Sequence, residues 1–217
     1  MGQKQMAQRI KQYTLSPVAL LLWSAAIVLS YFTLDQKLAL IFQQLQTSDL
    51  RHVAEFLTKF GYGLYYIVGL AVLFLFSRFV LKKSLLANRA LFLLLALIVS
   101  GITCDIFKII LGRARPVQWF QNDLFGFYFF QTKANMWGFP SGHASTIAAL
   151  MLGLCVIFPR YALAFVSFML IIAFSRVMVT AHYLSDTIAG VLLGAATVLL
   201  LAWQFRKKNI LITRRDI

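Results

Sequence analysis

The chain has 217 residues, of which 60% are hydrophobic and 13% are charged, and its formal net charge is +14. This composition excludes an ordinary soluble domain, in which about a quarter of the residues are charged. Together with a mean hydropathy of +0.78, the length indicates a single membrane-embedded domain over residues 1–217. The positive charge does not indicate nucleic-acid binding, because the basic residues flank apolar runs and form no patch on a polar domain.

Six apolar runs follow one another along the chain, and a helix needs about twenty such residues to cross a bilayer. We therefore expect an all-α, polytopic membrane protein with six transmembrane helices. The first run follows a basic N-terminus, and the five runs after it favour a retained signal anchor over a cleaved signal peptide. The runs are Pro17–Leu34, Tyr62–Val80, Ala90–Leu111, Ala144–Phe158, Tyr161–Thr180 and Ser185–Phe205.

Two further segments carry patterns of helix packing. Between the first two runs, Leu38–Phe60 has apolar residues at helical spacing among polar ones. This pattern predicts short amphipathic helices in the outer interface, which serve either for packing or as a lid over a lipid entrance. In the last run, Gly190 and Gly194 form a GxxxG pattern, which permits close helix contact. Packing within the chain is favoured over dimerisation, and the sequence leaves the oligomeric state unknown.

The charged residues indicate the orientation in the membrane. With the N-terminus inside and six spans, Asp216 is the one acidic residue on the inner side, and this asymmetry follows the positive-inside rule. We therefore expect both termini in the cytoplasm and the loop Gly112–Gly142 on the periplasmic side. The sequence has no Asn-x-Ser/Thr sequon, which is consistent with a bacterial inner membrane. The inner side would hold Lys4, Arg9, Lys11, Arg78, Lys82, Lys83, Arg89, Arg160, Arg206, Lys207, Lys208, Arg214 and Arg215.

Three groups of polar residues lie at the outer ends of the runs, where the cost of a charge near lipid often marks function. The first group is Lys108, Arg113 and Arg115. Lys108 and Arg115 are seven residues apart, so they share a face if the helix continues that far. The arginine fork and the lysine ammonium both suit phosphate oxygens. The alternative is that these basic side chains only snorkel at a helix end.

The second group is Ser141, Gly142 and His143, which follow Pro140 at the start of the fourth run. Backbone N–H groups at a helix start are unpaired and bind anions. A histidine in this first turn is placed to give a proton to a leaving oxygen. The alternative is a serine N-cap with an incidental histidine.

The third group is Arg176, His182 and Asp186. His182 and Asp186 are four residues apart, which predicts that they lie side by side on a helix. A carboxylate bonded to one imidazole nitrogen would fix the tautomer and free the other nitrogen to attack. The alternative is a structural His–Asp pair. Together the three groups favour attack on a phosphate, and the sequence has no metal-binding carboxylate cluster, so we expect metal-independent chemistry without a cofactor.

These residues resemble the signature of the type 2 phosphatidic acid phosphatase family, membrane lipid phosphate phosphatases related to vanadium haloperoxidases. That signature is a Lys, six residues and Arg-Pro; then Pro-Ser-Gly-His; and last Ser-Arg, five residues, His, three residues and Asp. The matching positions lie within residues 108–186: Lys108, Arg115-Pro116, Pro140-Ser141-Gly142-His143, Ser175-Arg176, His182 and Asp186.

The resemblance implies a role for each matching residue. His182 would be the nucleophile, oriented by Asp186, and His143 the general acid. No role follows for Arg113, which lies between signature positions. Contacts to the phosphate would come from Lys108, Arg115, Ser141, the Gly142 amide and Arg176.

The leading hypothesis from this resemblance is a lipid phosphatase that acts at the outer face through a phosphohistidine intermediate. The substrates it implies are undecaprenyl diphosphate, phosphatidylglycerol phosphate, phosphatidate and the 1-phosphate of lipid A, and the sequence does not choose among them. A lipid phosphotransferase would use the same phosphohistidine. A non-enzymatic anion or lipid transporter would need the cations alone, so the two histidines and the aspartate argue against it.

Overall fold

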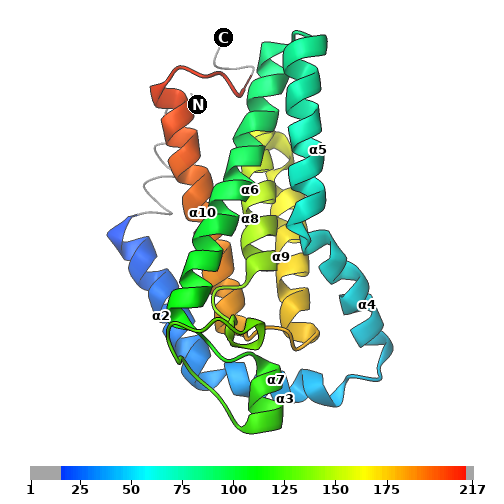
Figure 1. Cartoon of the computed structure of the whole chain (residues 1–217), viewed down its shortest axis with the longest axis vertical. Coiled ribbons are helices and arrows are strands. Elements are labelled where there is room, and N and C mark those ends of the chain that lie inside the picture. The colour runs from blue at the N-terminus through cyan, green and yellow to red at the C-terminus, as the bar shows by residue number, and fades with distance from the viewer. Residues whose placement is uncertain (1–15, 214–217) are drawn as a thin grey trace.

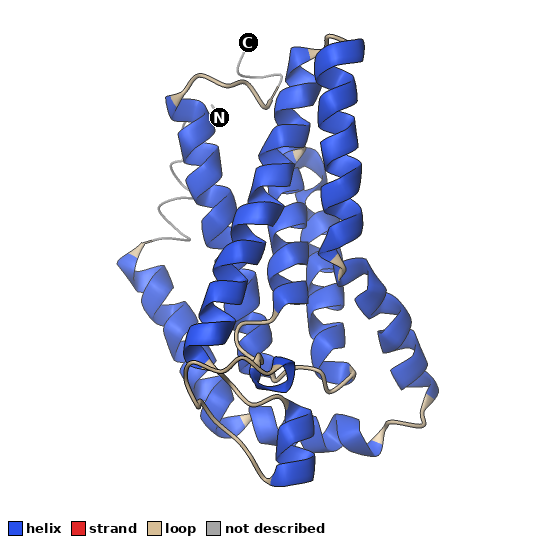
Figure 2. Cartoon of the chain, in the orientation of Figure 1, coloured by secondary structure: helices blue, strands red, loops and turns tan. Residues whose placement is uncertain are grey.

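The computed structural model describes residues 16–213, and all regular structure in that range is helical (Figure 2), which confirms the all-α class. The expected cytoplasmic residues Lys4, Arg9, Lys11, Arg214, Arg215 and Asp216 lie outside the described residues. The helices are α2 (Pro17–Thr33), α3 (Asp35–Gln44), α4 (Asp49–Thr58), α5 (Gly63–Leu75), α6 (Ser84–Leu111), α7 (Pro116–Asn122), α8 (Gly142–Ile157), α9 (Ala162–Met178) and α10 (Leu184–Lys207). Shorter turns are η1 (Lys59–Gly61), η2 (Phe76–Val80), η3 (Ala134–Met136) and η4 (Pro159–Tyr161).

The count of six spans is not confirmed. Within residues 16–213, four helical stretches are long and apolar enough to cross a membrane: Asp49–Val80, Ser84–Leu111, Pro159–Met178 and Leu184–Lys207. A fifth span results if α2 and α3, which meet at a bend of 56°, are counted together. The remaining run forms α8, which has 16 residues and is shorter than a standard span.

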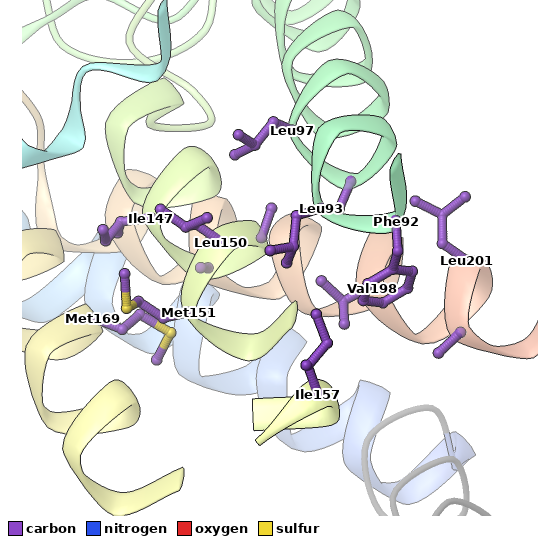
Figure 3. Packing of buried hydrophobic residues seen from close by; sticks show 14 of the residues in the cluster. Phe92, Leu93, Leu97, Ile147, Leu150, Met151, Ile157, Met169, Val198 and Leu201 are labelled. Atoms are coloured by element: carbon purple, nitrogen blue, oxygen red, sulfur yellow. The ribbon is translucent and has the colours of Figure 1, made fainter. Parts of the chain in front are cut away.

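Helix α8 lies at the centre of the bundle and packs against α6, α9 and α10 (Figure 1). Buried side chains from these four helices interlock in one cluster, which includes Phe92, Leu93, Ile147, Leu150 and Val198 (Figure 3). In a lipid environment such contacts hold helices together through close packing rather than through the hydrophobic effect. The central position of α8 explains why a short helix suffices there, since its neighbours cover most of it.

Gly190 and Gly194 form the contact of α10 with α8. A Cβ atom added at Gly190 would lie 2.5 Å from the Ser141 carbonyl oxygen, and one added at Gly194 would lie 2.6 Å from that of Ser145. The backbones therefore approach as closely as the GxxxG pattern predicts. This confirms that the pattern serves packing within the chain, and it brings the start of α10 beside Ser141.

We expect Gly194→Val to lower the free energy of unfolding by about 1–3 kcal/mol, because extra methyl groups in a filled contact force the helices apart. Gly101→Val is the matched control, because a Cβ atom at Gly101 meets nothing within 4 Å. Thermal unfolding of both variants in detergent checks this expectation. Equal melting temperatures would contradict it.

The C-terminal end of α6 is closed by backbone hydrogen bonds from the following loop. Gly112 has a left-handed φ of 55° and stops the helix after Leu111. Unpaired carbonyls at a helix end are costly away from water, and here residues 128–131 supply the missing donors. The N···O distances are 3.0 Å for Tyr128 to Gly112, 3.1 Å for Phe129 to Leu111, 2.9 Å for Phe130 to Ile110 and 3.0 Å for Gln131 to Ile109.

The amphipathic segment Leu38–Phe60 forms α3 and α4, as predicted. Both helices pack against α9 (Figure 1), which supports the packing interpretation of this segment. Apolar side chains on the opposite faces remain exposed, among them Ile41, Val53 and Phe56. Such faces suit lipid or the membrane interface.

Candidate active site

The structure brings the three predicted groups together at one end of the bundle. They lie where α6 ends, α8 begins, α9 ends and α10 begins, toward the lower end of Figure 1. The positive charges of Lys108, Arg115 and Arg176 all lie near enough to act on the rings of both His143 and His182. The site therefore combines three cations with two imidazoles.

His182 lies in the turn between α9 and α10 and is 3% exposed. Its Nδ1 is 2.7 Å from the Gly138 carbonyl oxygen. A carbonyl can only accept, so Nδ1 carries the proton and Nε2 carries the free lone pair. Burial lowers the pKa of His182 well below 6.5, and the charges of Arg115 and Arg176 lower it further. The ring is therefore neutral near pH 7.

The prediction that His182 and Asp186 share a helix is wrong. Helix α10 begins at Leu184, because the Asp186 carboxylate accepts the Tyr183 N–H at 2.8 Å and so caps the helix after His182. The distance from His182 Nδ1 to Asp186 Oδ2 is 3.6 Å, which is too long for a hydrogen bond. The Gly138 carbonyl fixes the tautomer instead, while Asp186 supplies a nearby negative charge.

Ser141 and Gly142 form the start of α8, as predicted. Ser141 is buried, and its N–H donates to the Asp186 carbonyl oxygen at 2.9 Å. A Cβ atom at Gly142 would lie 3.0 Å from Lys108 Nζ, so the ammonium group lies directly over the first turn of α8. Lys108 also forms a 2.8 Å ion pair with Asp105.

Arg115 reaches the site by a route that the sequence did not predict. Because α6 ends at Leu111, no continuous helix joins Lys108 to Arg115, and Arg115 instead precedes the first residue of α7. Its Nε and Nη2 atoms are both 3.4 Å from the Trp137 carbonyl oxygen. The two cations nevertheless approach the same histidines, because the loop folds back over the end of α6.

Helix α4 and turn η1 supply neighbours that sequence reasoning missed. Arg176 Nη1 donates to Thr58 Oγ1 at 2.5 Å, and a Cβ atom at Gly61 would lie 2.8 Å from His143 Cδ2. No motif marks either residue, because their roles arise from the packing of α4 against α9. Among the residues that the structure describes, Arg176 Nε and Ser141 Oγ are buried without a hydrogen-bond partner.

We expect Gly61→Ala to lower kcat roughly tenfold or more, because the added methyl group must displace the His143 ring and small misplacements of catalytic groups are costly. The matched control is Gly69→Ala, since a Cβ atom at Gly69 meets nothing within 4 Å. Steady-state rates with both purified variants test this expectation. Wild-type kcat in Gly61→Ala would show that the ring is not constrained there.

Arg113 is the residue for which the sequence indicated no role. It is fully buried and binds Asp186, Ser185 at 2.6 Å and Asp35 at 2.6 Å. Asp35 is the first residue of α3 and Asp186 lies in the first turn of α10, so Arg113 joins the N-terminal helices to the start of α10. Five aromatic rings surround the guanidinium group, with centroids 4.8–5.9 Å from Cζ: Tyr31, Phe125, Phe127, Phe139 and Tyr183.

Comparison with known proteins places this site in a family. The family model described as the PAP2 superfamily matches residues 89–210, more than half of the chain. The chain belongs to the PAP2 superfamily, the type 2 phosphatidic acid phosphatases. The match contains all three predicted groups and leaves Asp35, Thr58 and Gly61 outside it.

Two PAP2 relatives carry the same name. The chain is 33% identical over 174 residues to lipid A 1-phosphatase of Rhizobium johnstonii, which covers 76% of this chain and 71% of that protein. It is 32% identical over 172 residues to lipid A 1-phosphatase of Rhizobium etli, covering 75% and 74%. Undecaprenyl-diphosphatase of Sulfolobus acidocaldarius is 26% identical over 152 residues, covering 69% and 68%. No solved structure matches the chain significantly.

Within residues 16–213, no group of three or more His, Cys, Asp or Glu side chains is arranged to hold a metal ion. The residues of the three groups at the PAP2 site carry cationic, imidazole and hydroxyl groups, with Asp186 as their carboxylate. Such a set suits an anion with several oxygens. The apolar helices and the PAP2 membership together make the chain an integral membrane protein.

Proposed function

We propose that the protein is a lipid phosphatase that hydrolyses a phosphate monoester or diphosphate of a lipid through a phosphohistidine on His182. The observation that carries this proposal is the bond between His182 Nδ1 and the Gly138 carbonyl, which leaves Nε2 free among three cations. Binding of an anion needs only the cations. An oriented, neutral imidazole in addition is what nucleophilic attack requires.

In the first step, the Nε2 lone pair of His182 attacks phosphorus and forms an N–P bond. The bond from phosphorus to the leaving oxygen breaks, and His143 gives that oxygen a proton. Lys108, Arg115 and Arg176 bind the equatorial oxygens with the Gly142 amide and the Ser141 hydroxyl, and stabilise the charge that spreads over them. The buried Ser141 Oγ and Arg176 Nε, unpaired within residues 16–213, are free to bind these oxygens.

In the second step, a water molecule attacks phosphorus and gives a proton to His143. The N–P bond breaks, its electron pair returns to Nε2, and inorganic phosphate leaves. Each step moves protons and one phosphoryl group only. We therefore propose metal-independent hydrolysis without a cofactor.

We rank the 1-phosphate of lipid A first among the substrates, because both Rhizobium relatives are named for it. Undecaprenyl diphosphate comes second, after the more distant relative, and phosphatidylglycerol phosphate and phosphatidate follow. Phe129 and Phe130, whose backbone binds the end of α6, are 53% and 76% exposed, and aromatic side chains favour the membrane interface where lipid headgroups lie.

We further propose that residues 1–217 form one domain in the bacterial inner membrane, with six spans, cytoplasmic termini and a periplasmic site. One described contact agrees with this arrangement of the chain ends: Arg89 Nε donates to the Ile212 carbonyl oxygen at 2.9 Å. The end opposite the site therefore joins the start of α6 to the segment after α10, where the positive-inside rule expects basic residues. Cysteine labelling of Lys82 and Lys133 positions from either side of the membrane tests the orientation.

The test of the function is phosphate release by the detergent-solubilised protein from the four lipids, with EDTA present and with vanadate as inhibitor. Hydrolysis of one lipid, unaffected by EDTA and blocked by vanadate, supports the proposal. Transfer of phosphate to a second lipid without free phosphate would identify a phosphotransferase. Anion or lipid movement without either product would identify a transporter.

We expect kcat/KM to follow a bell-shaped curve against pH, because His182 must be neutral while His143 is protonated. The lowered pKa of His182 keeps Nε2 unprotonated into acid, so activity falls only as the pH drops through a value well below 6.5. A phosphate monoester itself ionises near pH 6, so a variant is needed to assign the acidic limb.

Arg115→Gln provides that assignment, because the Arg115 charge lowers the pKa of His182. Its removal moves the acidic limb of the enzyme to higher pH, whereas the ionisation of the substrate stays where it was. An acidic limb that does not move in Arg115→Gln would belong to the substrate, and a flat profile from about pH 5 to 9 would contradict the pair of roles.

A further inference from the structure

Asp35 is hydrogen-bonded to Arg113 and Ser185, next to the active site, although it lies outside the three motif groups and outside the family match. It is 1% exposed. Its carboxylate accepts from Arg113 Nη2 at 2.6 Å, from the Ser185 N–H at 2.9 Å and from the Ser185 hydroxyl at 2.5 Å. Ser30 Oγ donates a further bond at 3.1 Å.

The charges in this cluster do not balance. Arg113 carries one positive charge and lies between two carboxylates, Asp35 on Nη2 and Asp186 on Nη1. All three side chains are buried, and the surrounding aromatic rings keep the dielectric low, so that charges here act strongly on one another. One guanidinium group cannot neutralise both carboxylates. Asp186 therefore retains negative charge on Oδ2, the oxygen that faces His182.

We propose that Asp35 is a positioning residue. By pairing with Nη2 of Arg113, it prevents Arg113 from fully offsetting the negative charge of Asp186 beside His182. The proposal rests on the function proposed above. Asp35 touches neither the phosphate nor His182 and acts through Arg113 and Asp186.

The chemistry gives this charge a purpose. When the Nε2 lone pair forms the N–P bond and the leaving oxygen departs with its electron pair and a proton from His143, Nδ1 keeps its proton. The ring therefore becomes positively charged. Asp186 Oδ2 lies 3.6 Å from Nδ1, where it stabilises that charge. When water releases the phosphate, the electron pair returns to Nε2 and the ring is neutral again.

A purely structural clamp would use the same contacts, because Asp35, Arg113 and Asp186 tie three segments together. The two roles differ in what a charge-neutral replacement does. A clamp weakens with each lost bond, whereas a charge balance is restored when one positive and one negative charge are removed together. This difference defines the experiment.

The experiment measures kcat, KM and melting temperature for Asp35→Asn, for Asp35→Asn combined with Arg113→Gln, and for Ser30→Ala. In Asp35→Asn, Arg113 is free to neutralise Asp186, so we expect kcat to fall roughly tenfold with KM within about twofold. In the double variant, Asp186 is no longer neutralised, so kcat rises above that of Asp35→Asn. Ser30→Ala removes a neutral bond to Asp35 and keeps wild-type kcat.

The proposal is overturned if folded Asp35→Asn keeps wild-type kcat, or if the double variant is as slow as Asp35→Asn or slower. If Asp35→Asn does not fold, the double variant decides alone, and its kcat must lie within about threefold of wild type. If the wild-type protein itself releases no phosphate from any of the four lipids, the proposed function fails instead. The two failures are therefore distinguishable.

Discussion

His182→Ala is expected to reduce phosphate release by a factor of roughly 10⁴ or more, because loss of a covalent nucleophile removes the whole reaction path. In the proposed mechanism no neighbouring group takes over, since His143, whose ring lies against Gly61, is assigned the role of the acid. The cations remain in this variant, so lipid binding persists while turnover stops.

The measurement uses a ³²P-labelled lipid and an acid quench that follows both free phosphate and protein-bound phosphate. Wild-type protein should carry an acid-labile, base-stable label during turnover, and His182→Ala should carry none. His52→Ala is the matched control, because the His52 side chain is 73% exposed on α4. A labelled or active His182→Ala protein would end the phosphohistidine proposal.

Arg113→Met is expected to lower the free energy of unfolding by about 3–5 kcal/mol, the usual cost of removing one partner from a buried ion pair. Methionine fills much of the same volume among the aromatic rings. The loss of stability therefore comes from the carboxylates of Asp35 and Asp186, which are 1% and 0% exposed and would be buried without their cationic partner. This is among the largest destabilisations expected of a single substitution.

Thermal and denaturant unfolding in detergent measure this loss. Lys133→Met serves as the control, because it removes a cation from an exposed position in the same loop between α6 and α8. We expect this control to change stability by less than about 0.5 kcal/mol. Equal stability of the two variants would mean that the buried pair contributes little.

The sequence predicted the convergence of the three groups because helix ends are set by local patterns. One apolar run stops before Gly112, another starts after Pro140, and a third ends near Arg176. These boundaries place the three groups at one end of the bundle. The relation of His182 to Asp186 was mistaken for a similar reason. A spacing of four predicts a shared helix, yet the Asp186 carboxylate caps the helix at Tyr183 and leaves His182 in the turn.

Other parts of the site leave no mark in the sequence. The partner of His182 is a backbone carbonyl at Gly138, and every residue has one. Asp35 contacts Arg113, which lies 78 positions further along the chain, and Thr58 contacts Arg176, which lies 118 positions further along. Such pairings depend on how the N-terminal helices pack against the rest of the bundle. Periodicity within one helix carries no information about them.

The number of membrane spans could not be determined from the hydropathy of the sequence alone. An apolar run reports that a segment avoids water, and both lipid and protein provide such surroundings. Helix α8 is apolar because α6, α9 and α10 cover it, and it stays at 16 residues. Length and composition therefore leave its status as a separate span to experiment.

The backbone pairing of residues 128–131 with the last carbonyls of α6 has a mechanical consequence. Lifting this loop as a hinged cover would break four backbone hydrogen bonds, at about 1 kcal/mol each. The raised position would then hold only about one molecule in a thousand. Residues 128–131 therefore stay fixed against the end of α6, and any conformational change at this end of the bundle must come from other segments.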